Sequence, residues 1–129
     1  NISCPSPGKS LTRSEMEKYA SDIDLFLILY DNKSYRVSCS ASLIESLSYM
    51  KPILHFRNDC INYFNTPESP IGICSDTIDE FSLIMKDIIE NYSTYNQRFS
   101  TFRFNILKLR QKLAIENSIT SLRESFTWE

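Results

Sequence analysis

A serine-rich segment that ends in a carboxylate is the part of the chain best suited to chemistry. It reads Ser40-Ala-Ser-Leu-Ile-Glu45 and leads into apolar residues at helical spacing. A loop that enters a helix presents unpaired backbone amides and the positive end of the helix dipole, which suit a diphosphate. The segment therefore predicts an anion-binding helix start, with a carboxylate close behind it in the chain.

The same residues also have ordinary structural uses. Glu45 follows Ser42 by three residues, the spacing of a capping box, in which each side chain bonds a backbone amide near the other residue. Ser40 and Ser42 are favoured helix N-caps in any protein. A capping role and a ligand-binding role for Glu45 are compatible, so both interpretations stay open at this point.

Other titratable residues give weaker signals. His55 lies inside an apolar stretch, and we expect it to be packed or hydrogen-bonded rather than catalytic. Asp22 and Asp24 precede and interrupt an apolar run, as in the acidic pocket of a phosphoacceptor domain. Such a domain also has strands that end in an acceptor aspartate and in a lysine, and neither is evident in this sequence.

Three basic residues lie near the serine-rich segment: Lys33, Arg36 and Arg57. Basic residues of this kind are able to pair with a phosphate. The default expectation for charges in loops is solvation by water.

Cysteine, histidine and glycine usage excludes several kinds of site. A zinc site is not expected, because the chain has a single histidine and its cysteines form no CxxC pair. The cysteines are Cys4, Cys39, Cys60 and Cys74. We predict that they are reduced thiols in a cytoplasmic protein. Two glycines are too few for a P-loop or a complete GxGxxG loop.

Length and charge point to one globular domain over residues 1–129. The 14 basic and 16 acidic side chains give a net charge of -2, which argues against a nucleic-acid binder. No apolar run approaches the ~18–20 residues of a membrane span. The longest run, Ile23–Tyr30, has the length of a strand and contains Asp24.

The order of the apolar segments predicts an α/β fold. Helices are expected after Thr12 and Ser42, at capping-box spacings, and Pro52 is expected to end the second one. A turn of helix is expected near 61–64. Strands are expected at 23–30, 52–56 and 71–74. Short connections between these elements imply parallel pairing, and thus a three-layer domain with a short, mainly parallel sheet.

A helical tail is predicted from residue 77 to about residue 126. Thr77 and Glu80 have a third capping-box spacing. The apolar residues of the first tail helix are Ile78, Phe81, Met85, Ile88, Ile89 and Tyr92. Those of the second are Tyr95, Phe99, Phe102, Ile106, Leu109 and Leu113. We expect the second stripe to dock against the sheet or another domain, and a final helix to follow over residues 115–126.

Two longer segments carry a resemblance to a known family. The first is Ser21-Asp-Ile-Asp-Leu-Phe-Leu, and the second runs from Ser38 through Glu45 to Lys51-Pro-Ile-Leu54. Their order resembles the carboxyl-terminal, nucleotide-sugar-binding domain of GT-B glycosyltransferases of the group 1 or family 4 type. In that family an A-D-hydrophobic strand leads into S-G-x-x-x-E-A-L-A-x-G-K-P-V-I. The resemblance covers roughly residues 10 to 126 and implies a Rossmann-like fold.

The resemblance also implies roles for the site residues. Ser40, Ala41 and Ser42 would hold the phosphates of a nucleotide-diphosphate sugar through amides and hydroxyls. Glu45 would accept hydrogen bonds from the ribose hydroxyls. Transfer of the sugar would be independent of metals and cofactors, with helix-dipole and side-chain donors stabilising the leaving diphosphate. Assembly of surface polysaccharide or lipid-linked glycan is a setting that the resemblance suggests.

Three positions depart from the family pattern. The acidic residue that many members carry eight positions before the glutamate, where it contacts the donor sugar, is Val37 here. The usual glycines near positions 41 and 50 are Ala41 and Met50. These departures leave the identity of the donor sugar open.

The resemblance implies that the chain is the later part of a donor-binding domain. The amino-terminal acceptor domain would be missing, so no catalytic residue is assigned and the chain alone is not expected to be active. Peripheral membrane association of a full-length protein would be compatible with this interpretation. The alternative is a non-catalytic α/β interaction domain that docks a partner through its aromatic helical tail.

Overall fold

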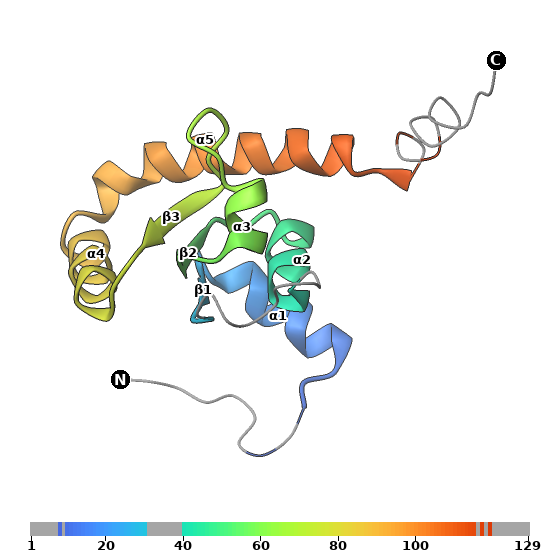
Figure 1. The fold of residues 1–129 in the computed structure, drawn as a ribbon. Coiled ribbons are helices and arrows are strands. Elements are labelled where there is room, and N and C mark those ends of the chain that lie inside the picture. The colour runs from blue at the N-terminus through green and yellow to red at the C-terminus, as the bar shows by residue number, and fades with distance from the viewer. Residues whose placement is uncertain (1–7, 9, 31–39, 116, 118, 120–129) are drawn as a thin grey trace.

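The sheet of this α/β chain consists of short parallel strands. The structure is a computed structural model that describes residues 8, 10–30, 40–115, 117 and 119. Within these residues the strands, in the order in which they pair, are β1 (Phe26–Ile28), β2 (Ile53–Phe56) and β3 (Gly72–Ser75). Phe26 pairs with Ile53, which pairs with Gly72 (Figure 1). The predicted Rossmann-like α/β class and the parallel pairing are confirmed.

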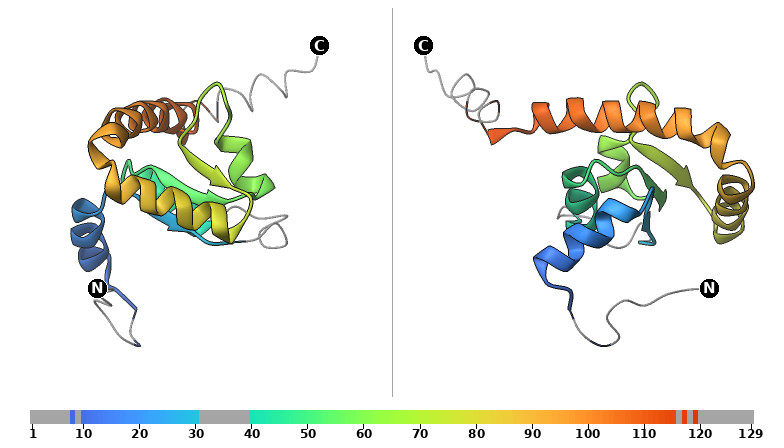
Figure 2. Two further views of the ribbon diagram at one scale, coloured as in Figure 1. Left: turned by 90° about the vertical axis from the view of Figure 1, so that its left-hand side faces the viewer. Right: turned by 180° about the vertical axis from the view of Figure 1, so that it is seen from behind.

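Five helices connect and cover the strands in the described part of the chain. They are α1 (Arg13–Asp22), α2 (Ala41–Ser48), α3 (Asp59–Phe64), α4 (Ile78–Glu90) and α5 (Tyr92–Lys112). Helices α2 and α3 pack on one face of the sheet, and α4 packs on the other (Figure 2). The long helix α5 runs beside β3 and contributes side chains to both faces.

Alternate residues of β2 divide the interior into two cores, as the two-residue repeat of a strand requires. Ile53 belongs to a core with Ile28, Leu43, Leu47, Ile61, Ile71 and Ile106. Leu54 belongs to a second core with Ile73, Phe81, Ile88, Phe99 and Phe102. A strand buried on both faces is typical of parallel sheets with helices on each side.

The strands β2 and β3 approach closely at Gly72. A Cβ atom at this position would lie 2.1 Å from the carbonyl oxygen of Ile53. Only glycine leaves room for this approach.

The stripe predicted along the second tail helix docks against the protein's own sheet. Phe99, Phe102 and Ile106 of this stripe are buried between α5 and the rest of the fold. Asn105 Nδ2 donates a hydrogen bond to the carbonyl oxygen of Pro70 at 2.8 Å and so ties α5 to the connection before β3. Most of the predicted final helix lies outside the described residues.

The capping boxes differ in how far they form. Thr12 and Glu15 make both bonds: Thr12 Oγ1 accepts from the Glu15 amide, and Glu15 Oε2 accepts from the Thr12 amide at 2.8 Å. At α4, Thr77 accepts from the Glu80 amide. The Glu80 carboxylate accepts instead from the Asp76 amide, at 2.6 Å.

Helix α2 ends in a Schellman motif rather than directly at Pro52. The Lys51 amide donates to the Ser46 carbonyl at 2.9 Å, and the Met50 amide donates to the Leu47 carbonyl at 3.1 Å. Met50 takes a left-handed conformation with φ 57°. Lys51 Nζ then caps the end of α1 by donating to the carbonyls of Ser21 and Ile23.

One sequence prediction about the sheet is wrong. The near-continuous apolar run Ile23–Tyr30 predicts a strand of that length that is covered on both faces, but β1 spans only Phe26–Ile28. Ile28 is buried, whereas the side chain of Leu27 is 46% exposed. The face of β1 that carries Leu27 is not covered by α4, because α4 packs over β2 and β3.

Candidate functional site

The carboxyl edge of the sheet is where the candidate site residues gather. Because the three strands are parallel, helices α2, α3 and α4, each of which follows a strand in the chain, all begin at this edge. Ligands of open α/β sheets bind outside the carboxyl ends of the strands. The first turns of these helices therefore decide which kind of ligand the edge attracts.

The start of α2 is the most favourable of the three for an anion. Its first turn holds no acidic side chain. The first turn of α3 holds Asp59, and that of α4 holds Asp79 and Glu80. Carboxylates compete with a bound anion for the positive end of a helix dipole. Ser40, Ala41 and Ser42 thus provide the one helix start at this edge, among the described residues, that is not already neutralised by a carboxylate.

Ser40 is the N-cap of α2. Its Oγ accepts from the Leu43 amide at 3.2 Å, and the residue is 1% exposed. The hydroxyl keeps its own proton for a second partner. Ala41 follows it as the first residue of the helix and is exposed. The amides of the first turn have no carbonyl partner within a helix.

Ser42 lies one residue further, inside the helix. Its Oγ is 2.7 Å from the Tyr30 hydroxyl, so the hydrogen bond joins α2 to the residues that follow β1. The bond fixes the side chain in the first turn of α2. Tyr30 was not identified from the sequence, in which nothing links it to Ser42.

The predicted capping box between Ser42 and Glu45 is wrong, because the N-cap is Ser40. Glu45 therefore lies beyond the first turn, where it cannot reach the N-cap amide. Its Oε1 is 3.5 Å from Arg13 Nη1, and its side chain is 34% exposed. Ser42 and Glu45 are three residues apart and share one face of α2. The carboxylate is thus beside the helix start without being used to cap it.

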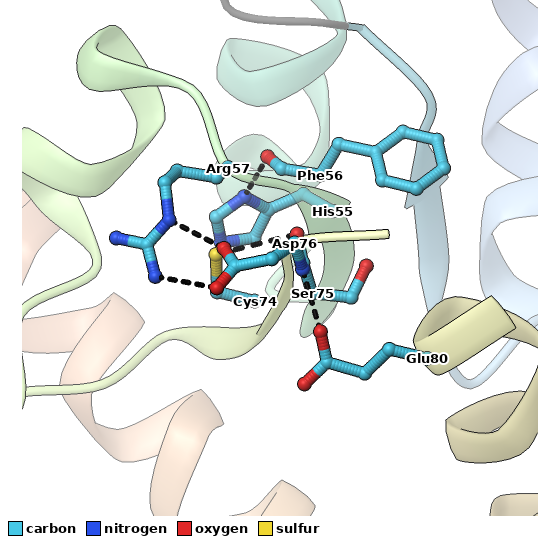
Figure 3. A network of polar contacts seen from close by, with 7 residues as sticks. All are labelled: His55, Phe56, Arg57, Cys74, Ser75, Asp76 and Glu80. Atoms are coloured by element: carbon cyan, nitrogen blue, oxygen red, sulfur yellow. Dashed lines mark hydrogen bonds and ion pairs between the residues drawn. The ribbon is translucent and has the colours of Figure 1, made fainter. Parts of the chain in front are cut away.

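A second polar group lies where β2 and β3 end (Figure 3). Arg57 forms a two-pronged ion pair with Asp76, in which Nη2 donates to Oδ2 at 3.1 Å and Nε donates to Oδ1. The Arg57 guanidinium lowers the pKa of Asp76 through these hydrogen bonds. Arg57 is therefore paired with a carboxylate rather than free for a phosphate. The sequence signal for this pair was a charge at the end of each of two neighbouring predicted strands.

His55 is buried and fully hydrogen-bonded, in agreement with the prediction from its apolar strand. Asn65 Oδ1 accepts from the amides of Ile71 and Gly72, so its Nδ2 faces His55 Nε2, at 2.8 Å. Nε2 must then be an acceptor, and Nδ1–H donates to the Phe56 carbonyl at 2.7 Å. Burial lowers the pKa of His55, which keeps the ring neutral. This arrangement positions β2 and β3 and leaves no ring nitrogen for catalysis.

Ser75 and Cys74 end β3 beside the Arg57–Asp76 pair. The Ser75 hydroxyl is buried and has no hydrogen-bond partner in the described part of the chain. Buried polar groups normally find a partner, so this hydroxyl is able to bind a ligand atom or water at the carboxyl edge. Burial raises the pKa of the Cys74 thiol, which favours an unreactive, protonated group.

The two early aspartates do not form a phosphoacceptor pocket. Asp24 precedes β1, so it lies at the amino edge of the sheet, opposite the candidate site. Its Oδ1 is 3.9 Å from Arg103 Nη2, and its hydrogen bond with Tyr92 raises the pKa of that tyrosine. Asp22 ends α1 and accepts a hydrogen bond from Ser21. Asp24 therefore contacts α5 through Tyr92 and Arg103.

Several predicted residues lie outside the described ranges: Cys4, Lys33, Arg36, Val37 and Cys39. Cys60 and Cys74 are free thiols. The described ranges contain no group of three or more His, Cys, Asp or Glu side chains arranged to hold a metal ion. They also contain no helix with the length and apolar character needed to cross a membrane.

No protein family model, curated protein or solved structure matches this chain.

Proposed function

We propose that the chain binds the diphosphate of a nucleotide sugar at the start of α2, as the donor-binding part of a glycosyltransferase. The observation that carries the proposal is electrostatic. Among the three helix starts at the carboxyl edge, α2 is the one whose first turn is free of carboxylates. The sequence resemblance supplies the class of ligand.

Each site residue then has a defined task. The amides of Ala41 and Ser42 bind phosphate oxygens, while the buried Ser40 caps the helix and so positions these amides. Glu45 accepts hydrogen bonds from the ribose hydroxyls, on the face of α2 that it shares with Ser42. The helix dipole and these donors stabilise the charge that develops on the leaving diphosphate.

The proposed reaction needs more than these residues. A sugar acceptor and the base that activates its hydroxyl would be bound by a separate acceptor domain, so the chain's own contribution is donor binding. Nucleotide sugars for glycan assembly imply a cytoplasmic location. The free thiols of Cys60 and Cys74 are compatible with that location.

Amide chemical shifts test the proposal directly. Uridine, guanosine and adenosine diphosphates are titrated into the ¹⁵N-labelled chain, a method that also detects weak binding. At least one nucleotide is expected to shift the amides of Ser40, Ala41 and Ser42 more than those at the starts of α3 and α4. Equal shifts at all three helix starts, or none at any, would refute the proposed site.

Glu45→Ala and Glu17→Ala separate a ribose contact from a general charge effect. Both glutamates are partners of Arg13, at 3.5 Å for Glu45 and 3.1 Å for Glu17. Glu45→Ala is expected to weaken binding of the active nucleotide about tenfold, the scale of a lost hydrogen bond to a charged group. Glu17→Ala is expected to leave it unchanged. Equal effects of the two variants would remove Glu45 from the site.

A further inference from the structure

Helix α5 carries an unusually one-sided charge. It holds five basic side chains and no acidic one, whereas the whole chain has 14 basic and 16 acidic side chains. The basic residues of α5 are Arg98, Arg103, Lys108, Arg110 and Lys112. The rest of the chain has nine basic and sixteen acidic residues, so α5 has a net charge of +5 and the remainder has a net charge of -7.

Most of this charge is not neutralised within the described residues. Arg103 lies 3.9 Å from Asp24. For Lys108, Arg110 and Lys112 no ion pair is found in the described part of the chain, and all three are exposed. Lys108 Nζ is 4.4 Å from the centre of the Phe104 ring, which keeps the ammonium near an apolar side chain.

The outward side of α5 also exposes apolar side chains. Phe104 is 56% exposed, Leu107 is 43% exposed and Ile115, just beyond the helix end, is 69% exposed. With 3.6 residues per turn, Phe104 points away from the buried Phe102 and Ile106, toward the side that the sheet does not cover. Figures 1 and 2 show α5 along the outside of the molecule, with the other helices and the sheet on one side of it.

We propose that the outer face of α5, defined by Phe104, Leu107, Lys108, Arg110 and Lys112, lies on an anionic membrane surface. In an interfacial helix, apolar side chains enter the headgroup region while flanking basic side chains reach anionic lipids. The helical wheel has this order, with Arg110 on one flank of Phe104 and Lys112 on the other. The helix lies on the bilayer, since it is not apolar enough to cross one.

Charge and exposed apolar groups together favour a membrane over a nucleic acid or an acidic protein. Binding to a nucleic-acid backbone is dominated by basic groups, and exposed leucine and isoleucine contribute little to that contact. The other parts of the chain carry a net negative charge, which an anionic lipid surface repels. Helix α5 is therefore the part of the molecule that would face such a surface. The proposal is independent of the nucleotide site, because none of the residues that define the outer face of α5 belongs to the start of α2.

The test is sedimentation of the full 129-residue chain with lipid vesicles. Vesicles of phosphatidylcholine with phosphatidylglycerol should bind the chain, and vesicles of phosphatidylcholine alone should not. Salt at about 1 M, where the Debye length is about 3 Å, should release it. The double variant Lys108→Glu/Lys112→Glu should weaken binding at least about twentyfold, at about fivefold for each lost basic residue.

Matched variants control for net charge and for exposed apolar area. Lys18→Glu/Lys86→Glu makes the same charge change on exposed lysines of α1 and α4, and it should change binding less than about threefold. Phe104→Ser should weaken binding, whereas Leu83→Ser, at an α4 residue that is 68% exposed, should not. Circular dichroism of each variant establishes that the fold is intact.

Three results would overturn the proposal. The chain does not sediment with the anionic vesicles, or the two double variants lose binding equally, or the chain binds soluble polyglutamate through α5 and ignores vesicles. The last result would assign the surface to an acidic protein partner.

Discussion

Arg13 and Glu45, separated by 32 positions in the chain, form an ion pair where α1 passes α2, with Arg13 Nη1 3.5 Å from Glu45 Oε1. The Arg13 guanidinium also lies 5.4 Å from the centre of the Tyr49 ring. The pair brings α1 beside the proposed ribose contact.

We expect this pair to matter little for folding. The Arg13 and Glu45 side chains are 64% and 34% exposed, and ion pairs at such exposure contribute little to stability. Arg13→Ala and Glu45→Ala should each leave the urea midpoint of unfolding nearly unchanged. A large fall in the midpoint for Glu45→Ala would mean that a loss of nucleotide binding in this variant reflects folding instead of a ribose contact.

A second prediction concerns Met50, whose left-handed backbone strains any residue with a Cβ atom. Met50→Gly should be more stable than Met50→Ala by about 1 kcal/mol, because glycine relieves the left-handed strain. Both variants lose the methionine side chain, which packs against the core of Ile53, so the comparison isolates the backbone. The free energy of unfolding in urea gives the difference. If the alanine variant is as stable as the glycine variant, the backbone at Met50 is not strained.

A third prediction contrasts the two glycines. Gly72→Ala should lower the free energy of unfolding by at least about 2 kcal/mol, because the new methyl group would overlap the Ile53 carbonyl. Gly8→Ala meets open space but keeps φ at +68°, so it should cost about 1 kcal/mol. Thermal or urea unfolding of both variants checks the order. A reversal would mean that β2 and β3 separate easily at Gly72.

A fourth prediction is the pH dependence of stability. Burial lowers the pKa of His55 in the folded state, so the unfolded chain binds a proton more readily than the folded chain. The contribution of the neutral His55 to the free energy of unfolding is therefore fully present above the unfolded histidine pKa of about 6.5. This contribution is lost as the pH decreases below that value toward the folded pKa. The slope should not exceed about 1.4 kcal/mol per pH unit.

Urea unfolding at intervals between pH 7.5 and about pH 5 measures this slope, in a range above the ordinary carboxylate pKa values. His55→Gln, which retains an acceptor for Asn65 but does not titrate, should flatten the curve. The chain has one histidine, so a slope that persists in His55→Gln would contradict the assignment.

The sequence was informative where a local rule determines the structure. The Thr12–Glu15 capping box, the order of strands and helices and the burial of Phe99, Phe102 and Ile106 all follow from spacing within a few residues. These patterns require only local bonds or a single buried face, so tertiary contacts reinforce them.

The site was less predictable because its contacts join distant residues. The Ser42–Glu45 spacing matched a capping box, but the N-cap of α2 is Ser40. Glu45 forms an ion pair with Arg13 instead. No local rule chooses between two serines that both suit an N-cap. Asn65, whose amide joins His55 to the start of β3, carried no signal at all, since its partners are set by the tertiary fold.

The exposed Leu27 face of β1 has a consequence for handling the protein. On this side, α4 and Leu27 line an apolar groove, and β1 is the last strand at its edge of the sheet in the described residues. Within the described residues, no further strand pairs with the outer edge of β1, beside which Leu27 is exposed. An edge of this kind is a template for pairing between molecules. Concentrated solutions of this chain should therefore self-associate through β1, and a lysine in place of Leu27 would be the simplest way to keep the molecules apart.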